Sequence, residues 1–308
     1  MADIVITEFM DEAALTAIPK HTSVLYDPTL VDRPADLLRE ASCAKALIVR
    51  NRTQVRGDLL KAAGALKVVG RLGVGLDNID EAACAARGIA VLPASGANDL
   101  SVAEWVIGTA MLLLRGAYLS TSDVAAGTWP RARLIGRELS GKTMGLVGYG
   151  AIAQEVARRA SALGMHCIAF DPYLADDHPA WIMAHRHGLE PLLREADVVS
   201  LHVPLNETTA KMMDAVRLKR MKKDAILLNA ARGGVVDEAA LAAALKAGAL
   251  GGAALDVFDE EPLSAARGAV FADCPNLVLT PHIAGVTQES NIRVSHVTVA
   301  NVLKALEN

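Results

Sequence analysis

The sequence predicts an α/β protein made of two doubly wound lobes, each with a parallel sheet covered by helices. Its 308 residues amount to about two domains of common size. Short apolar runs alternate along the chain with segments of helical periodicity, which is typical of parallel strands buried between helices. This alternation begins at residues 4–6 and starts again at residues 143–147, after a turn-rich stretch at 125–130.

Each apolar run is assigned to a strand. The first lobe is expected to have strands at 4–6, 24–26, 46–49, 68–70 and 89–92. A long apolar helix is expected from Leu100 to Leu119, either as a hinge or as a subunit contact. The second lobe is expected to have strands at 143–147, 167–170, 198–201, 225–228, 252–255 and 277–279, and a last helix is expected at about 288–306.

Composition narrows the class of function to small-molecule chemistry. The formal net charge is −4, the sequence pI is near 6.1 and only 4% of the residues are aromatic, so neither nucleic acid nor an anionic membrane is an expected partner. The four cysteines form no CxxC pair, so we expect neither a metal site nor a disulfide framework. No window reaches the roughly 20 apolar residues that span a bilayer, and no basic leader opens the chain, so a cytoplasmic location is expected.

A glycine motif follows the expected strand at 143–147. The string Gly-Tyr-Gly-Ala-Ile-Ala occupies residues 148–153 and leads into a helical pattern. Gly148 permits the tight turn, Gly150 lets a pyrophosphate approach the backbone, and the helix N-terminus supplies N–H donors. Ala153 takes the third glycine position, where a small residue suffices for packing. The motif predicts a dinucleotide-binding Rossmann lobe, and the alternative is a glycine-rich turn without a ligand.

The next expected strand is followed by Asp171, an acid that bears on the choice between NAD and NADP. Asp171 lies 23 positions after Gly148, near the offset at which a carboxylate accepts hydrogen bonds from the adenosine ribose. Its charge would repel a 2′-phosphate, and Pro172-Tyr173 behind it offers no arginine to receive one. NAD is therefore expected rather than NADP. The alternative is a solvated acid at a strand end.

Three polar residues follow successive strands of the second lobe, namely Arg232, Glu261 and His282. Strand C-termini crowd around the ligand crevice of a doubly wound sheet, so these side chains can converge. The guanidinium can fork to a carboxylate and polarise the adjacent carbonyl, the imidazole can exchange the proton of the alcohol, and the glutamate can fix the imidazole tautomer. If each residue is considered alone, Arg232 could instead cap a turn, Glu261 could be a solvated acid, and His282 could be a loop histidine with satisfied hydrogen bonds.

Five ordered motifs resemble the D-isomer-specific 2-hydroxyacid dehydrogenase family, specifically its phosphoglycerate dehydrogenase-like branch. They occupy residues 148–153, 202–205, 229–237, 254–262 and 280–285, and the resemblance covers essentially the whole chain. It implies the roles given above for Arg232, Glu261 and His282. It also implies a discontinuous, flavodoxin-like substrate lobe of residues 1–97 plus 286–308 around an NAD-binding Rossmann lobe of residues 98–285.

The resemblance also implies the residues that line both ligand sites. Besides the glycines and Asp171, the NAD site is expected to include Ala151, Ile152, Val203, Pro204, Ala230, Ala231, Arg232, Asp256, His282 and Gly285, with Asp256 near the carboxamide. In the family, two loops of the first lobe bring a basic side chain and backbone N–H groups to the substrate. The matching residues here are Arg50, Asn51, Arg52, Val74 and Gly75, with Asn98 as a further candidate.

The substrate is expected to be a small anion. Arg50 and Arg52, with Arg131 and Arg133, are more basic residues than a neutral tail such as that of lactate needs, so we hypothesise a second anionic group at C3. The alternative is that these arginines are solvated and lie on the rim of a subunit. The opening at 7–12 resembles the branch that acts on (S)-3-sulfolactate, which we favour. D-3-phosphoglycerate, hydroxypyruvate or glyoxylate reduction, and a non-enzymatic NAD-sensing corepressor or scaffold remain alternatives.

Assembly and regulation complete the expectations. A homodimer is expected through residues 100–133, because basic residues after the matching Trp can reach a neighbouring subunit's substrate in phosphoglycerate-type members. The sequence stops at residue 308, so feedback by serine through an additional C-terminal domain is not expected.

Overall fold

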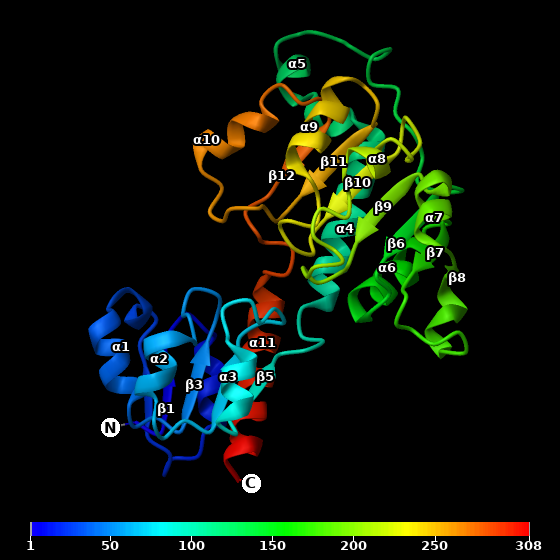
Figure 1. Ribbon diagram of the computed structural model, residues 1–308. Helices are drawn as coiled ribbons and strands as arrows, with labels where there is room; N and C mark the ends of the chain where they lie inside the picture. Colours follow the sequence, from blue (N-terminus) through cyan, green and yellow to red (C-terminus); the bar gives the residue numbers. More distant parts are fainter. Residues whose placement is uncertain (1, 308) are drawn as a thin grey trace. The chain divides into compact units, whose positions relative to one another are not determined.

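The computed structural model describes residues 2–307, which divide into two compact units (Figure 1). Unit 1 contains the residues up to Asn98 together with those from Val286 onward, and unit 2 contains Asp99 to Gly285. The chain therefore leaves unit 1 once and returns to it with a single segment. Both units are α/β, as the alternating pattern predicts.

Unit 1 is built on a five-stranded parallel sheet in the order β2-β1-β3-β4-β5, the doubly wound order of flavodoxin-like folds. The strands read as continuous apolar runs because both faces of the sheet are covered. They are β1 (Ile4–Ile6), β2 (Val24–Tyr26), β3 (Ala46–Val49), β4 (Val68–Arg71) and β5 (Ala90–Pro93). The helices are η1 (Glu12–Ala17), η2 (Leu30–Asp32), α1 (Pro34–Ala41), α2 (Gly57–Ala62), α3 (Glu81–Ala86) and α11 (Gln288–Glu307).

Helix α11 brings the end of the described chain back onto the sheet of unit 1 (Figure 1). Its buried residues Val299 and Val302 belong to the same apolar cluster as Ile48 and Val68. Gly70 in β4 lies directly beneath the helix, so that a Cβ at this position would stand 2.5 Å from Val302 Cγ2. The absence of a side chain at Gly70 is what lets helix and sheet approach closely.

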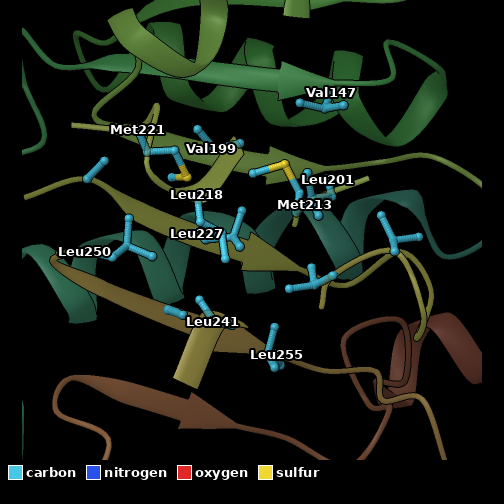
Figure 2. Packing of buried hydrophobic residues seen from close by; sticks show 14 of the residues in the cluster. Val147, Val199, Leu201, Met213, Leu218, Met221, Leu227, Leu241, Leu250 and Leu255 are labelled. Atoms are coloured by element: carbon cyan, nitrogen blue, oxygen red, sulfur yellow. The ribbon is translucent and has the colours of Figure 1, made fainter. Parts of the chain in front are cut away.

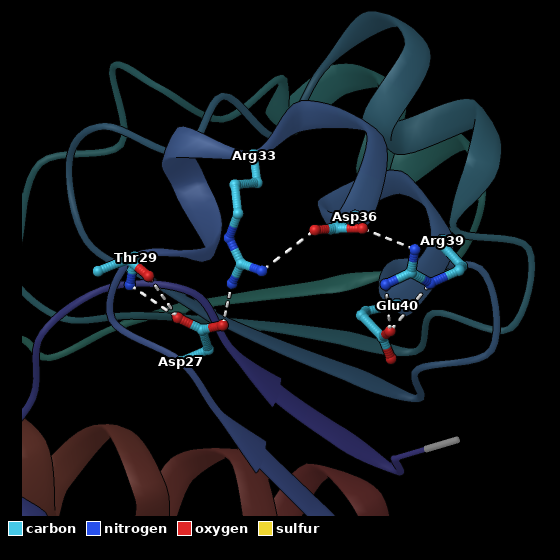
Figure 3. A network of polar contacts seen from close by, with 6 residues as sticks. All are labelled: Asp27, Thr29, Arg33, Asp36, Arg39 and Glu40. Carbon is cyan, nitrogen blue, oxygen red and sulfur yellow. Dashed lines mark hydrogen bonds and ion pairs between the residues drawn. The ribbon is translucent and has the colours of Figure 1, made fainter.

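The surface between β2 and α1 carries a chain of exposed ion pairs (Figure 3). Asp27 accepts hydrogen bonds from Thr29 and Arg33, and Arg33 also pairs with Asp36, which pairs in turn with Arg39. The hydrogen bonds from Thr29, with the charge of Arg33, lower the pKa of Asp27 against the opposing effect of burial. Pairs exposed to solvent contribute little to stability, so the apolar contacts carry the fold of this unit.

Unit 2 is built on a seven-stranded parallel sheet in the order β12-β11-β10-β9-β6-β7-β8. The strand order reverses at β6, as in a Rossmann fold. The strands are β6 (Thr143–Val147), β7 (His166–Phe170), β8 (His185–Arg186), β9 (Val198–Leu201), β10 (Ile226–Asn229), β11 (Gly252–Leu255) and β12 (Leu277–Leu279). The helices are α4 (Asp99–Arg115), η3 (Ala117–Leu119), α5 (Thr121–Ala125), α6 (Ala151–Ala162), η4 (Pro179–Met183), α7 (Leu189–Glu195), α8 (Ala215–Leu218), α9 (Glu238–Lys246), α10 (Ala265–Gly268) and η5 (Ala269–Phe271).

Two apolar clusters sandwich this sheet. Figure 2 shows part of one of them, in which Leu201 and Leu227 from the strands lie with Leu241 of α9. In the other cluster Val106 of α4 and Val156 of α6 pack with further strand residues. Helices thus cover both faces, which confirms the predicted α/β class and the doubly wound arrangement.

The structure departs from the expected elements in two places. The helix expected from Leu100 to Leu119 ends at Arg115, because Gly116 adopts a left-handed φ of 61° and a short 3-10 turn follows. The two-residue strand β8 was not predicted, since so short an element has no detectable periodicity. Within residues 2–307, no helix combines the length and the apolar character needed to cross a bilayer.

The fit between α11 and β4 can be tested by a single added methyl group. We expect Gly70→Ala to lower the free energy of unfolding by about 1–3 kcal/mol, because the new Cβ would overlap Val302 and Thr298. Urea unfolding followed by circular dichroism measures the change. Gly64→Ala is the matched control, since a Cβ there meets no atom within 4 Å. Equal stability of the two variants would contradict this account of the packing.

Candidate active site

The carboxyl ends of six strands in unit 2 lie in register at one edge of the sheet. Val147 pairs with Phe170 and Leu201, Leu201 pairs with Asn229, Asn229 with Leu255, and Leu255 with Leu279. The residues that follow these strand ends are therefore neighbours across the edge. They include every residue of unit 2 that the sequence predicts for the cofactor or for catalysis.

His282 and Glu261 form a hydrogen-bonded pair at this edge. Nδ1 of His282 lies 2.6 Å from Oε2 of Glu261, and the other carboxylate oxygen accepts the backbone N–H of Phe258 at 3.0 Å. The glutamate therefore orients the ring and fixes Nδ1 as its hydrogen-bonded nitrogen. Nε2 is the nitrogen that remains to exchange a proton with a substrate.

The carboxylate of Glu261 is kept ionised by its neighbours. Burial raises its pKa, but the hydrogen bonds from His282 and Phe258, with the charges of His282 and Arg232, outweigh burial and bring the pKa below its ordinary value. The pair consequently contains an anionic acceptor at any pH near neutrality. Such an acceptor stabilises a positive charge on the imidazole.

Arg232 is brought next to this pair by tight packing of two loops. A Cβ at the neighbouring Gly233 would lie 1.8 Å from the carbonyl oxygen of Phe258, so only glycine allows the loops after β10 and β11 to approach. The N–H of Gly234 donates to Asp259 of the second loop at 2.8 Å. The main chain of Arg232 is fixed as well, because the Asn229 amide donates to its carbonyl at 3.0 Å.

Asp256 holds the loop that carries His282. Its carboxylate is almost fully buried and accepts the N–H groups of Ile283 and Ala284, both at 2.8 Å, and the hydroxyl of Thr280 at 2.6 Å. His282 itself has a left-handed φ of 52°, a conformation that persists where its surroundings enforce it. The structure thus gives Asp256 a visible role in shaping this loop, in addition to its expected place near the carboxamide.

A second histidine at the same edge is unsuited to proton exchange. His202 follows β9, and its Nε2 lies 2.9 Å from the buried hydroxyl of Ser200. Burial lowers the pKa of His202 to about 4, so this ring stays neutral near pH 7. The pairing with a carboxylate distinguishes His282 from it.

The glycine loop has the geometry that a dinucleotide pyrophosphate requires. Gly148 has a φ of 85°, and a Cβ there would lie 2.5 Å from the carbonyl oxygen of His202. A Cβ at Gly150 would meet no atom within 4 Å, so this position opens onto free space directly before helix α6. Open space beside the N–H groups of a helix N-terminus fits a bound pyrophosphate.

Asp171 ties the glycine loop to the loop after β7. One carboxylate oxygen accepts the N–H of Tyr149 at 2.9 Å, and the other accepts those of Tyr173 and Leu174 at 2.9 and 3.2 Å. Oδ2, which accepts a single N–H, retains capacity for a further donor, as ribose recognition would require. Tyr149 is in addition stacked on Trp181 of η4, with ring centroids 5.1 Å apart.

A pocket beside Asp171 contains residues that the sequence analysis missed. Phe170, Asp171 and Pro172 line it together with Arg186, His187 and Gly188. Pro172 and Tyr173 offer no arginine, as expected, but β8 pairs with β7 and brings Arg186 into the same pocket. The guanidinium of Arg186 pairs with Asp176 and stands over the ring of Trp181. A strand of two residues offers no pattern from which this could have been found.

The remaining cofactor candidates occupy the same strand edge. They are Ala151 and Ile152 at the start of α6, Val203 and Pro204 after β9, Ala230 and Ala231 after β10, and Gly285 after β12. Arg131 lies elsewhere in unit 2, in the exposed segment between α5 and β6, where Arg133 pairs with Asp123.

The substrate candidates of unit 1 follow three adjacent strands. Arg50, Asn51 and Arg52 follow β3, Val74 and Gly75 follow β4, and Asn98 follows β5. The two arginines of the first loop have different surroundings in the structure. Arg52 is exposed and pairs with Asp32, whereas Arg50 is half-buried and has no carboxylate partner among residues 2–307.

Comparison with known proteins agrees with this geometry. The family profile described as D-isomer specific 2-hydroxyacid dehydrogenase, NAD binding domain, matches residues 107–284, all of which lie in unit 2. The chain belongs to the D-isomer-specific 2-hydroxyacid dehydrogenase family. It is an NAD-dependent oxidoreductase that acts on the CH–OH group of 2-hydroxy acids, which confirms the reaction class and the cofactor expected from the sequence.

Individual relatives of this 2-hydroxyacid dehydrogenase cover nearly the whole chain. It is 54% identical to (S)-sulfolactate dehydrogenase of Chromohalobacter salexigens, over 99% of both chains. It is 37% identical to D-3-phosphoglycerate dehydrogenase of Archaeoglobus fulgidus, over 97% of this chain but only 56% of that protein. A crystal structure of D-lactate dehydrogenase from Aquifex aeolicus with NAD and lactic acid is 28% identical, covers 99% of this chain and has a TM-score of 0.85.

The ionised state of Glu261 predicts an acid dependence of stability. Its pKa is lower in the folded chain than its ordinary value of 4.5, so its contribution is complete above that value and is lost as the pH falls through the folded-state pKa. We expect the free energy of unfolding to fall more for the wild type than for Glu261→Gln between neutral pH and about pH 3. Urea titrations at each pH measure the difference, and parallel curves would contradict it.

Proposed function

We propose that this dehydrogenase oxidises (S)-3-sulfolactate to the corresponding 2-oxo acid with NAD. The observation that carries the proposal is the 54% identity to an (S)-sulfolactate dehydrogenase over 99% of both chains. The phosphoglycerate dehydrogenase of Archaeoglobus fulgidus is less similar, and the chain spans 56% of its length. The substrate would carry a carboxylate, a C2 hydroxyl and a sulfonate on C3.

Arg50 is the residue that we assign to the C3 sulfonate. Its Nη2 donates to Asn291 at 3.0 Å, and its guanidinium stands over the ring of Phe9. Burial lowers the pKa of Arg50, partly offset by the charge of Glu8, yet an arginine remains protonated in proteins. A partly desolvated cation without a carboxylate partner gains from an anionic ligand, which supports Arg50 over the already paired Arg52.

The residues of unit 2 supply the chemistry at C2. Arg232 forks to the substrate carboxylate and polarises the adjacent C2 oxygen. Nε2 of His282 takes the hydroxyl proton, and the carboxylate of Glu261 stabilises the resulting imidazolium through Nδ1. NAD, when bound along the glycine loop, supplies the hydride acceptor. In the reverse direction the same imidazolium returns its proton to the forming alcohol.

We propose in addition that the enzyme is a cytoplasmic homodimer. The segment after α4 exposes large apolar side chains, with Tyr118, Trp129 and Ile135 at 64%, 72% and 82% exposure, and a second copy of the chain would cover them. All four cysteines are free, which suits a reducing compartment.

Arg232→Lys tests whether the protein works as an enzyme through this site. A lysine keeps the charge but loses the two-pronged contact with a carboxylate, so we expect kcat/KM for 2-oxo acid reduction to fall at least about 100-fold. Initial rates of NADH consumption measure this. Lys219→Arg, on the exposed surface at the end of α8, is the control. Unchanged turnover in Arg232→Lys would overturn the assignment of Arg232 to the substrate carboxylate.

A panel of four alcohols tests the substrate. We expect NAD reduction to be fastest with (S)-3-sulfolactate, slower with D-3-phosphoglycerate, and slowest with glycerate and lactate, because only the first two carry an anion beyond C2. The ratio of kcat/KM for sulfolactate to that for lactate, called here the anion preference, is the quantity to compare. An anion preference near one would refute the assignment of a C3 anion. A higher kcat/KM for phosphoglycerate would replace the sulfonate by a phosphate.

A further inference from the structure

Glu8 is a buried carboxylate that the reaction chemistry does not use. It lies two residues after β1 and is 4% exposed. Its Oε1 accepts the N–H groups of Arg50 and Thr53, both at 2.9 Å, and its Oε2 accepts the N–H of Arg52 at 3.1 Å. One side chain thus collects three of the four backbone donors of the loop at residues 50–53.

These hydrogen bonds decide which way the loop faces. Since the N–H groups of Arg50, Arg52 and Thr53 point to Glu8, they are not available to a ligand. The carbonyl oxygens of Arg50 and Thr53 are also occupied, because the buried amide of Asn78 donates to them at 3.2 and 2.7 Å. Of the four backbone donors in this loop, only the N–H of Asn51 is left for a substrate, so the loop meets a ligand mainly through its side chains.

The fixed backbone sets the position of the Arg50 guanidinium. That group extends to Asn291 of α11, with Nη2 to Oδ1 at 3.0 Å, and lies 5.9 Å from the centroid of the Phe9 ring. Phe9 is the neighbour of Glu8 in the chain. The acid that folds the loop is thus in the same short segment as the ring that supports the arginine.

We propose that Glu8 is a positioning and specificity residue of this enzyme, which holds the loop at residues 50–53 so that Arg50 is placed for the C3 anion of the substrate. The inference rests on the proposed function, because it needs Arg50 to bind that anion. Glu8 does not touch the substrate. It acts through the loop, and therefore through Arg50.

A carboxylate suits this position better than an amide does. It has two oxygens that only accept, and so it can receive three N–H donors. The amide of a glutamine would turn an NH2 group toward at least one of those donors. One backbone N–H would then be buried without a partner, which is costly enough to rearrange the loop.

A double-mutant cycle on the full-length enzyme tests the proposal. The variants are Glu8→Gln, Arg50→Gln and the combination of both, and the readout is the anion preference defined above. We expect Arg50→Gln and Glu8→Gln each to lower the anion preference at least about tenfold through KM for sulfolactate. In the double variant we expect no further loss beyond that of Arg50→Gln, because both substitutions act on the same contact.

The outcomes separate the inference from the proposed function. If Arg50→Gln leaves the anion preference at its wild-type value, Arg50 does not bind the C3 anion, and the assignment of Arg50 and the inference on Glu8 both fall. The proposed oxidation of sulfolactate falls only if the wild-type anion preference is itself near one. If Arg50→Gln lowers it and Glu8→Gln does not, the inference on Glu8 alone is overturned. Equal losses from Glu8→Gln with and without Arg50 would also overturn it, since Glu8 would then act by another route.

Two further variants exclude a merely structural role. Thr7→Val removes a buried hydroxyl that bonds to the Thr53 side chain at 2.8 Å, and we expect it to lower the melting temperature while leaving the anion preference unchanged. A matching loss of anion preference in Thr7→Val would contradict the proposal. If Glu8→Gln does not fold, Glu8→Asp replaces it in the cycle. The shorter carboxylate of Glu8→Asp cannot reach all three donors, so we expect the anion preference to fall, but less than expected for Glu8→Gln. An unchanged anion preference in Glu8→Asp would contradict the proposal.

Discussion

Buried or half-buried carboxylates at or just after the ends of strands hold several loops of the candidate site in place. Glu8 after β1, Asp171 after β7 and Asp256 after β11 each accept three hydrogen bonds from loops that belong to other strands or to the following turn. A carboxylate with this many donors repays the cost of its burial. Each parallel sheet places the loops after its strands at one of its own edges, and these acids then fix how the loops they bind present their side chains.

Because these acids hold the loops in place, the candidate catalytic side chains can remain partly exposed. His282 and Glu261 keep 49% and 33% of their side-chain surfaces accessible, so a substrate can reach them. Their rigidity comes from Asp256 beneath them and from the contact of Gly233 with the Phe258 carbonyl. The exposed ion pairs of Figure 3 show the contrasting case, in which charges meet at the surface without fixing a functional group.

Much of the fold could be read from the sequence, because parallel strands buried on both faces leave short apolar runs and the glycine motif marks the first turn of unit 2. Arg232, Glu261 and His282 could be named because each follows a strand of the same sheet. The pairing of Arg52 with Asp32, which separates it from Arg50, depends on a neighbour 20 residues earlier in the chain. The partners of Glu8 lie 42 to 45 residues away in the sequence. No local sequence pattern predicts the Arg52–Asp32 pair or the contacts of Glu8.

The return of the chain to unit 1 has a consequence for the order of biosynthesis. Helix α11 fills the space over Gly70 and supplies Asn291 to Arg50, yet it follows all of unit 2 along the chain. During synthesis on the ribosome, the face of the unit 1 sheet that α11 covers stays incomplete until all of unit 2 has been made. Unit 2 is continuous in the chain and has its own core. The arginine loop thus reaches its final surroundings only after the dinucleotide-binding unit has been synthesised.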